Sequence, residues 1–165
     1  FFITFRDFFI KKFNNISQNI AHFGFSLLIL SILFNSLFSS EIITNLKVGE
    51  TFEDLNTKII LKSIEQKEEK NFKSIIANFN IENSKGIIEN LSPELRIYNQ
   101  PNIVTSEADI KTTMMSDKFI VINVVQNQDY FNVRYQVKPF MLWIWLSVLL
   151  ISFGGLLSLF KKNYE

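Results

Sequence analysis

His22, the only histidine of the chain, lies in a stretch without charged residues that runs from residue 19 to residue 38. A neutral imidazole can bind haem iron, or it can hydrogen-bond a neighbouring helix. Ala21 and Gly24 are small, so that either a flat macrocycle or a second helix fits closely beside this histidine. The residues alone leave the interpretations open, and a histidine that hydrogen-bonds a neighbouring helix or reaches the membrane interface is the commoner case.

Two basic residues, Arg134 and Lys138, point to the same side of a predicted strand that ends just before the second uncharged stretch. Their positions favour contacts with lipid headgroups or water. The sharper alternative is that they bind the carboxylates of a ligand, and the propionates of a haem would suit them.

A polar set in the middle of the chain comprises Glu94, Arg96, Glu107, Asp109 and Asp117. Paired carboxylates can perform acid–base chemistry, but surface ion pairs are far more common. The chain has no cysteine, and the sequence shows no Ser-His-Asp set, no glycine-rich phosphate loop and no cluster with metal-ligand spacing. We therefore predict no catalytic residue in this chain by itself.

Two uncharged apolar stretches, residues 19–38 and 140–160, determine the architecture. Twenty helical residues reach about 30 Å, the thickness of a bilayer core, so each stretch predicts a transmembrane helix. Trp143 and Trp145 lie where interfacial aromatic residues are expected. Gly154-Gly155 interrupts the second stretch, and Gly154 shares a helical face with Ser147 and Ser158, which favours close helix packing over a cofactor face.

The flanks of the two stretches predict the orientation of the chain. Basic residues precede the first stretch and follow the second, and such flanks remain in the cytoplasm or the matrix of an organelle. Residues 41–138 are thus predicted to be exported, and residues 161–165 to form a cytoplasmic tail. Residues 1–18, rich in phenylalanine, are either an interfacial amphipathic helix or the end of a preceding span. Because the chain begins with Phe1, we expect it to be the C-terminal part of a longer protein.

The residue pattern of the exported segment 41–138 predicts β structure. Apolar and polar residues alternate over 131–138, residues 119–125 are rich in β-branched side chains, and the link 126–129 suggests a hairpin between them. Residues 58–64 and 72–81 are further candidate strands, separated by a charged turn at 66–70. The fold class is therefore a membrane protein in which two transmembrane α-helices flank a small antiparallel β domain, a sandwich or a barrel. The net charge of +1 makes nucleic acid an unlikely partner.

An ordered series of motifs resembles the CcmF family of cytochrome c maturation proteins. The series consists of Ile20-Ala-His-Phe-Gly24, Pro93-Glu-Leu-Arg-Ile-Tyr98, Thr105-Ser-Glu-Ala-Asp-Ile110, Asp117-Lys-Phe-Ile-Val121, Val133-Arg-Tyr-Gln-Val-Lys-Pro-Phe-Met-Leu-Trp-Ile-Trp-Leu146 and Phe153-Gly-Gly-Leu-Leu157. Their order and spacing are similar to the family's over residues 19–160, which would be only the last part of a multi-span family member.

The resemblance implies a function and a cofactor. Members of this family are haem lyase subunits: they receive haem from a haem chaperone and help to attach it to the cysteines of apocytochrome c. They also hold a b-type haem in the membrane, which is thought to keep the incoming haem iron reduced. By resemblance, His22 is one axial ligand of the b haem, and the second ligand and the haem-joining centre lie outside this chain.

The resemblance also implies partners and a location. We expect contacts with the remainder of the CcmF chain, other haem lyase subunits, the haem chaperone, apocytochrome c and membrane lipid, in a bacterial inner membrane with residues 41–138 in the periplasm. A mitochondrial inner membrane is the less favoured location. The alternative hypothesis is a non-catalytic two-span receptor or scaffold whose exported β domain binds a protein partner.

Overall fold

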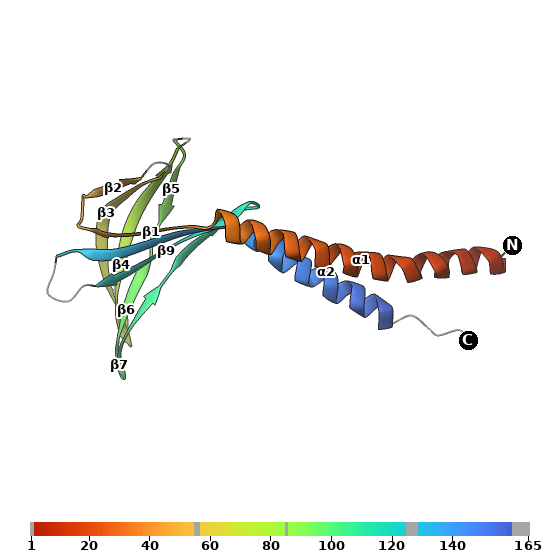
Figure 1. The fold of residues 1–165 in the computed structure, drawn as a ribbon. Coiled ribbons are helices and arrows are strands. Elements are labelled where there is room, and N and C mark those ends of the chain that lie inside the picture. The colour runs from red at the N-terminus through yellow and green to blue at the C-terminus, as the bar shows by residue number, and fades with distance from the viewer. Residues whose placement is uncertain (1, 55–56, 85, 125–128, 160–165) are drawn as a thin grey trace. The chain divides into compact units, whose positions relative to one another are not determined.

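The computed structural model describes residues 2–54, 57–84, 86–124 and 129–159, and for residues 2–15 it describes the helical backbone alone. The chain forms two compact units. A helical unit contains both helices and the turn at residues 113–116, and a β unit contains the two sheets. Each unit is described by itself below, and Figure 1 shows the order of the elements along the chain.

The helical unit consists of α1 (Phe2–Phe38) and α2 (Met141–Leu159). Residues 16–38 of α1 and the whole of α2 are long and apolar enough to cross a membrane, which fits the two predicted spans. Helix α1 continues without a break through residue 19, where the sequence predicted a boundary. Whether residues 1–18 lie at the interface or end an earlier span stays a prediction.

Helix α2 begins one residue later than predicted. Phe140 has a φ of 59° and lies in the left-handed region, which is unusual for a bulky side chain. Its backbone N–H donates to the carbonyl of Met115, while its own carbonyl accepts from Ile144. The side-chain amide of Asn35 donates to the carbonyl of Pro139 over 2.6 Å, and the rings of Phe34 and Phe140 lie 5.1 Å apart. These contacts fasten the end of α1 to the start of α2.

Small residues line the seam where the two helices pack. Ser17, Gly24 and Ser31 of α1 are buried, and so are Ser147 and Gly154 of α2. Within each helix these residues are seven apart, a spacing that keeps one helix face against a partner. The hydroxyl of Ser17 donates to the carbonyl of Gly154 over 2.8 Å. The close packing predicted for Gly154 is confirmed, whereas Ser158 is exposed.

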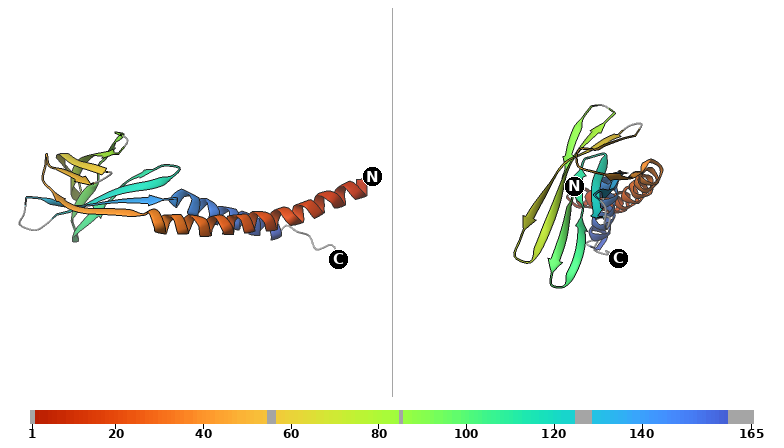
Figure 2. Two further views of the ribbon diagram at one scale, coloured as in Figure 1. Left: turned by 45° about the horizontal axis from the view of Figure 1, so that its top comes forward. Right: turned by 90° about the vertical axis from the view of Figure 1, so that its left-hand side faces the viewer.

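Ten strands of the described residues form two sheets, which can be followed by colour in Figures 1 and 2. The four-stranded sheet has the order β1-β10-β9-β8, and the six-stranded sheet has the order β2-β3-β4-β6-β7 with β5 also paired to β4. The strands are β1 (Ser40–Leu46), β2 (Thr51–Asp54), β3 (Thr57–Glu68), β4 (Phe72–Asn83), β5 (Ile88–Leu91), β6 (Glu94–Asn99), β7 (Asn102–Glu107), β8 (Asp109–Thr112), β9 (Ser116–Val124) and β10 (Phe131–Pro139).

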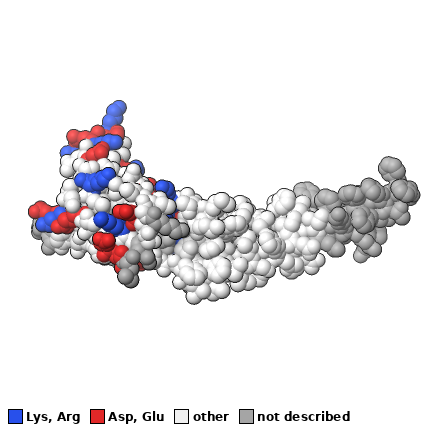
Figure 3. Space-filling view, turned by 90° about the horizontal axis from the view of Figure 1, so that it is seen from above, with Lys and Arg blue, Asp and Glu red and all other residues white. Residues whose placement is uncertain are grey.

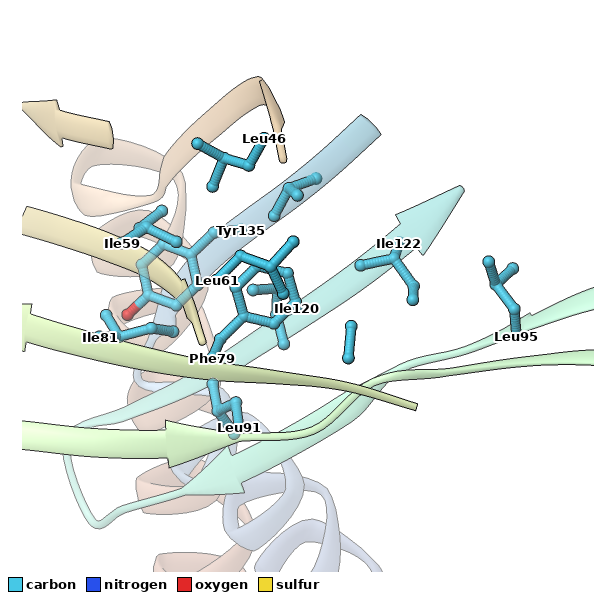
Figure 4. Packing of buried hydrophobic residues seen from close by; sticks show 12 residues of the cluster. Leu46, Ile59, Leu61, Phe79, Ile81, Leu91, Leu95, Ile120, Ile122 and Tyr135 are labelled. Atoms are coloured by element: carbon cyan, nitrogen blue, oxygen red, sulfur yellow. The ribbon is translucent and has the colours of Figure 1, made fainter. Parts of the chain in front are cut away.

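Apolar side chains from both sheets meet in one core, shown in Figure 4. The alternation predicted for β10 is confirmed, because Val133 and Tyr135 are buried and Arg134 is exposed. The core contains Leu46, Ile59, Leu61, Ala77, Phe79, Ile81, Leu91, Leu95, Ile120, Ile122, Val133 and Tyr135. Burial of this apolar area from water is what holds the two sheets together.

Some predicted boundaries of the β unit are wrong. The turn expected at 66–70 is shorter, because β3 continues to Glu68 and pairs with Lys73 of β4. Strand β9 begins at Ser116 rather than at 119. Strands β9 and β10 are neighbours in their sheet, as the hairpin prediction requires. Most of the predicted link, residues 126–128, lies outside the described residues, as does residue 125.

Candidate functional site

His22 lies on α1 with its side chain exposed, away from the seam with α2. Its backbone carbonyl accepts a hydrogen bond from the hydroxyl of Ser26 over 3.0 Å. In the part of the chain that the structure describes, its imidazole has neither a hydrogen bond nor an ion pair. An ionisable side chain in a membrane span normally faces a protein or cofactor partner. The partner of this imidazole must therefore come from outside the described residues if residue 22 lies at membrane depth.

The small neighbours of His22 are occupied by α2 rather than open to a ligand. A side chain added at Gly24 would meet Leu150 and Ile151 of α2 within 3.0 Å. Ala21 lies against Gly154 of α2. A Cβ added at Gly154 would lie 2.8 Å from the backbone nitrogen of Ala21. The sequence left open whether a flat macrocycle or a second helix packs beside these small residues. The structure shows that a second helix, α2, does.

The face of α1 that carries His22 is otherwise mainly apolar. Phe25 and Ile29 follow it by three and seven residues and are both more than half exposed. Gln18 and Ser26 lie one turn before and one turn after it, and both are exposed. This face of α1 thus carries one imidazole among mainly apolar side chains, and a neutral imidazole is a ligand that haem iron accepts.

Arg134 has a partner within the β unit. Its Nε pairs with Oε1 of Glu41, and the side-chain amide of Gln136 donates to the same oxygen over 2.7 Å. Strands β1 and β10 are adjacent, which places these three side chains on one face of the sheet. A ligand carboxylate at Arg134 would have to compete with Glu41. The role of Lys138, which is half-buried, stays a prediction.

The predicted polar set is divided by the fold. Glu94 and Arg96 of β6 form an ion pair of 3.1 Å, and Glu107 of β7 lies opposite Glu94. The hydrogen bond from Arg96 lowers the pKa of Glu94, which is the opposite of what a proton donor near neutral pH needs.

The remaining two carboxylates of the set lie on other strands, β8 and β9. Asp109 accepts from the backbone N–H of Ser92 over 2.6 Å, and Asp117 begins the part of β9 that pairs with β8. Among the described residues there is also no group of three or more His, Asp or Glu side chains that could hold a metal ion. The carboxylates of Glu94 and Asp109 are thus engaged in an ion pair and a hydrogen bond, whereas Oδ1 of Asp117 is buried without a hydrogen-bond partner among the described residues.

The β unit contains a buried ion pair that the sequence did not predict. Glu89 of β5 is buried, and one of its carboxylate oxygens accepts from Nζ of Lys118 over 2.7 Å. Nζ of Lys111 lies 3.8 Å from the other oxygen. Burial, together with the charge of Glu89, raises the pKa of Tyr135 to about 12. No feature of the sequence marks Glu89 as a buried residue. Its two neighbours along β5 are themselves exposed, so the strand does not show an apolar face next to a polar one.

Together these observations define a membrane-anchored β-sandwich protein with an outward-facing histidine on its first span. Residues 37–139 match the family model described as the CcmF C-terminal beta-sandwich, and the chain therefore belongs to the CcmF family. This confirms the predicted resemblance and the predicted fold class.

Curated relatives agree with this assignment. The chain is 37% identical over 119 residues to the cytochrome c-type biogenesis protein ccl1 of Rhodobacter capsulatus, a match that covers 72% of this chain and 18% of that protein. It is 30% identical over 148 residues to the cytochrome c-type biogenesis protein CcmF of Pseudomonas fluorescens, covering 90% of this chain and 22% of the relative. The chain thus spans about a fifth of the length of these relatives.

A solved structure shares the fold. The cytochrome c haem lyase CcmF superimposes with a TM-score of 0.71 at 16% sequence identity, over 90% of this chain and 25% of that one. The likeness extends beyond the residues of the family model, since it covers nearly the whole of this chain. At this identity it supports the architecture alone.

Proposed function

We propose that this chain is the C-terminal part of a cytochrome c haem lyase subunit and that His22 is an axial ligand of a b-type haem in the membrane. The observation that carries the proposal is the exposed imidazole of His22 on an apolar helix. Among the described residues, this imidazole has no hydrogen-bond or ion-pair partner. A neutral imidazole is a strong ligand for haem iron, and ligation satisfies a group that is costly to leave alone in hydrocarbon.

The residues around His22 fit such a haem. Phe25 and Ile29 present apolar surface on the same helix face, and Ser26 is small and turns its hydroxyl back to the helix backbone. The second axial ligand is proposed to come from a segment outside this chain. When bound, the haem would supply an electron that keeps the iron of the substrate haem reduced.

The contribution of the chain itself is to hold the imidazole in place. The seam of small residues lets α2 approach α1 closely on the side opposite to the ligand face. A helix supported in this way has little freedom to rotate, so the Cα–Cβ bond of His22 keeps one direction. The orientation of a ligating histidine is one of the features by which proteins tune a metal site.

The β unit is proposed to be a periplasmic platform in a bacterial inner membrane. Figure 3 shows that both signs of charge gather on the β unit, whereas the described helices are almost free of them. We propose that this surface contacts apocytochrome c or the haem chaperone, beside other lyase subunits and the remainder of the full-length chain.

Arg134 and Lys138 are proposed to contact lipid headgroups or haem propionates. We propose that catalysis belongs to the assembled complex, since the sequence predicts no catalytic residue in this chain by itself.

The test is the reduced-minus-oxidised visible spectrum of the purified full-length protein. The wild type should show the bands of a six-coordinate b-type haem. His22→Ala should lose these bands while the protein still inserts into the membrane, and added imidazole should restore part of them by filling the vacated ligand position. Haem content, measured as the pyridine haemochrome, gives a second readout that is independent of lyase activity.

Gln18→Ala is the matched control. It removes a polar side chain from the same helix face, one turn from His22, without removing an imidazole. We expect its spectrum to match that of the wild type. An unchanged spectrum and haem content in His22→Ala would show that the axial assignment is wrong, and the chain would then be two anchors and a binding platform.

A further inference from the structure

The turn between β8 and β9, together with the first residue of β9 (residues Thr113–Ser116), belongs to the helical unit rather than to the β unit. It is closed by three hydrogen bonds between its two ends. The backbone N–H of Thr113 donates to the carbonyl of Ser116, and the hydroxyl of Thr113 both donates to that carbonyl and accepts from the backbone N–H of Ser116. The turn is therefore a defined structure with its own internal bonds.

Two further hydrogen bonds fasten the turn to the start of α2. The indole N–H of Trp143 donates to the carbonyl of Met114, and the backbone N–H of Phe140 donates to the carbonyl of Met115, each over 2.8 Å. The turn is thus held at the level of the first turn of α2. If α2 spans a membrane, this level is the boundary between hydrocarbon and headgroups.

The side chains at the tip of the turn are apolar and exposed. Met114 is 67% exposed and Met115 is 63% exposed. The carbonyls of these two residues, which would be costly to bring near hydrocarbon, are already satisfied by Trp143 and Phe140. The turn therefore presents two flexible apolar side chains outward and keeps these carbonyls for internal bonds.

We propose that the Met114–Met115 tip inserts into the bilayer and adds a membrane contact to those of α1 and α2. Apolar side chains with satisfied backbone carbonyls, at the depth of an interfacial tryptophan, are what the headgroup boundary accepts. Two side chains are too few for the core of a stable protein–protein interface, which needs some 20 to 30 residues a side. A lipid surface is therefore the occupant that these observations favour over another protein.

The experiment uses single cysteines in the full-length protein, reconstituted in vesicles of phosphatidylethanolamine and phosphatidylglycerol. Met114→Cys and, separately, Met115→Cys are labelled with an environment-sensitive nitrobenzoxadiazole dye. Quenching is then measured with lipids that carry a nitroxide on the headgroup or deep on the acyl chain, and with iodide in the water. Using both sites keeps the test valid if one variant does not fold.

We expect a blue-shifted emission that the headgroup nitroxide quenches more strongly than the deep nitroxide or iodide does. Leu149→Cys, an exposed position within α2, is the control for deep quenching, and Lys70→Cys, in a charged turn, is the control for water. Strong iodide quenching at both methionine sites, as at Lys70, would overturn the proposal. A blue-shifted emission that no lipid nitroxide quenches would overturn it as well, because the tip would then be covered by protein.

Discussion

At the scale of single residues, two ion pairs of the β unit differ in how much water they meet. The side chains of Glu89 and Lys118 are only 10% and 17% exposed, whereas those of Glu68 and Lys73 are 74% and 59% exposed. Water screens the second pair and scarcely reaches the first. The loss of one partner should therefore be much more costly at Glu89 than at Glu68.

Lys118→Met should lower the free energy of unfolding of the β unit by about 2 kcal/mol, because it leaves the Glu89 carboxylate buried with only the more distant Lys111. Lys73→Met is the control and should change it by less than about 0.5 kcal/mol. Denaturant midpoints of the full-length protein, followed by hydrogen exchange in β9, measure both. Equal losses in the two variants would contradict the argument.

The same residues show what the sequence can and cannot predict at this scale. His22 stands out because it is the only histidine and lies in an uncharged stretch, so its need for a partner follows from the sequence. Its direction does not, since the closeness of α2 to Ala21 and Gly24 depends on packing. Glu89 gives no signal, because the neighbouring Ile87 and Ile88 are exposed while the carboxylate is buried.

At the scale of elements, the two adjacent glycines of α2 have different surroundings. A Cβ at Gly154 would lie 2.8 Å from the Ala21 nitrogen and 3.0 Å from the Ser17 carbonyl oxygen, both of which are backbone atoms. A Cβ at Gly155 would meet nothing within 4 Å. One glycine is thus required by helix packing, and the other is not.

Gly154→Ala should force the two helices apart and destabilise the helical unit by about 1 to 3 kcal/mol. Gly155→Ala should be neutral or slightly stabilising, because alanine favours a helix over glycine by up to about 1 kcal/mol. Thermal unfolding of the full-length protein in detergent compares the two variants directly. A lower midpoint for Gly155→Ala than for Gly154→Ala would mean that the described seam is not the packing surface.

The elements that sequence alone predicted are those with a strong period. Strands β3, β4, β9 and β10 carry β-branched or alternating residues, and both spans lack charge. Strands β2, β7 and β8 are short and mostly exposed, and β5 has only four residues, so their own residues do not mark them. Their place is set by pairing with longer neighbours, which is a property of the assembled sheet.

At the scale of the whole molecule, the charges predict which side of the membrane each segment faces. Basic residues flank the outer ends of both spans, so residues 41–138 should lie on the periplasmic side. In a version of the full-length protein whose other cysteines are removed, a cysteine at Lys70 should react with a membrane-impermeant maleimide in intact cells.

A cysteine at Lys12 should react with this maleimide only after the membrane is opened. The reverse pattern would invert the proposed orientation. Reaction at both positions in intact cells would mean that the first span does not cross the membrane.

The adjacency of β1 and β10 has an evolutionary consequence. Ser40 pairs with Val137, so the β unit begins and ends on neighbouring strands, about 5 Å apart. In the helical unit the Asn35 side chain reaches the Pro139 carbonyl, so its two open ends meet as well. A β sandwich with this spacing could have been inserted into an existing helical hairpin, and could later be exchanged for another, without moving either helix. In such a history the helical unit and the β unit can change at separate rates.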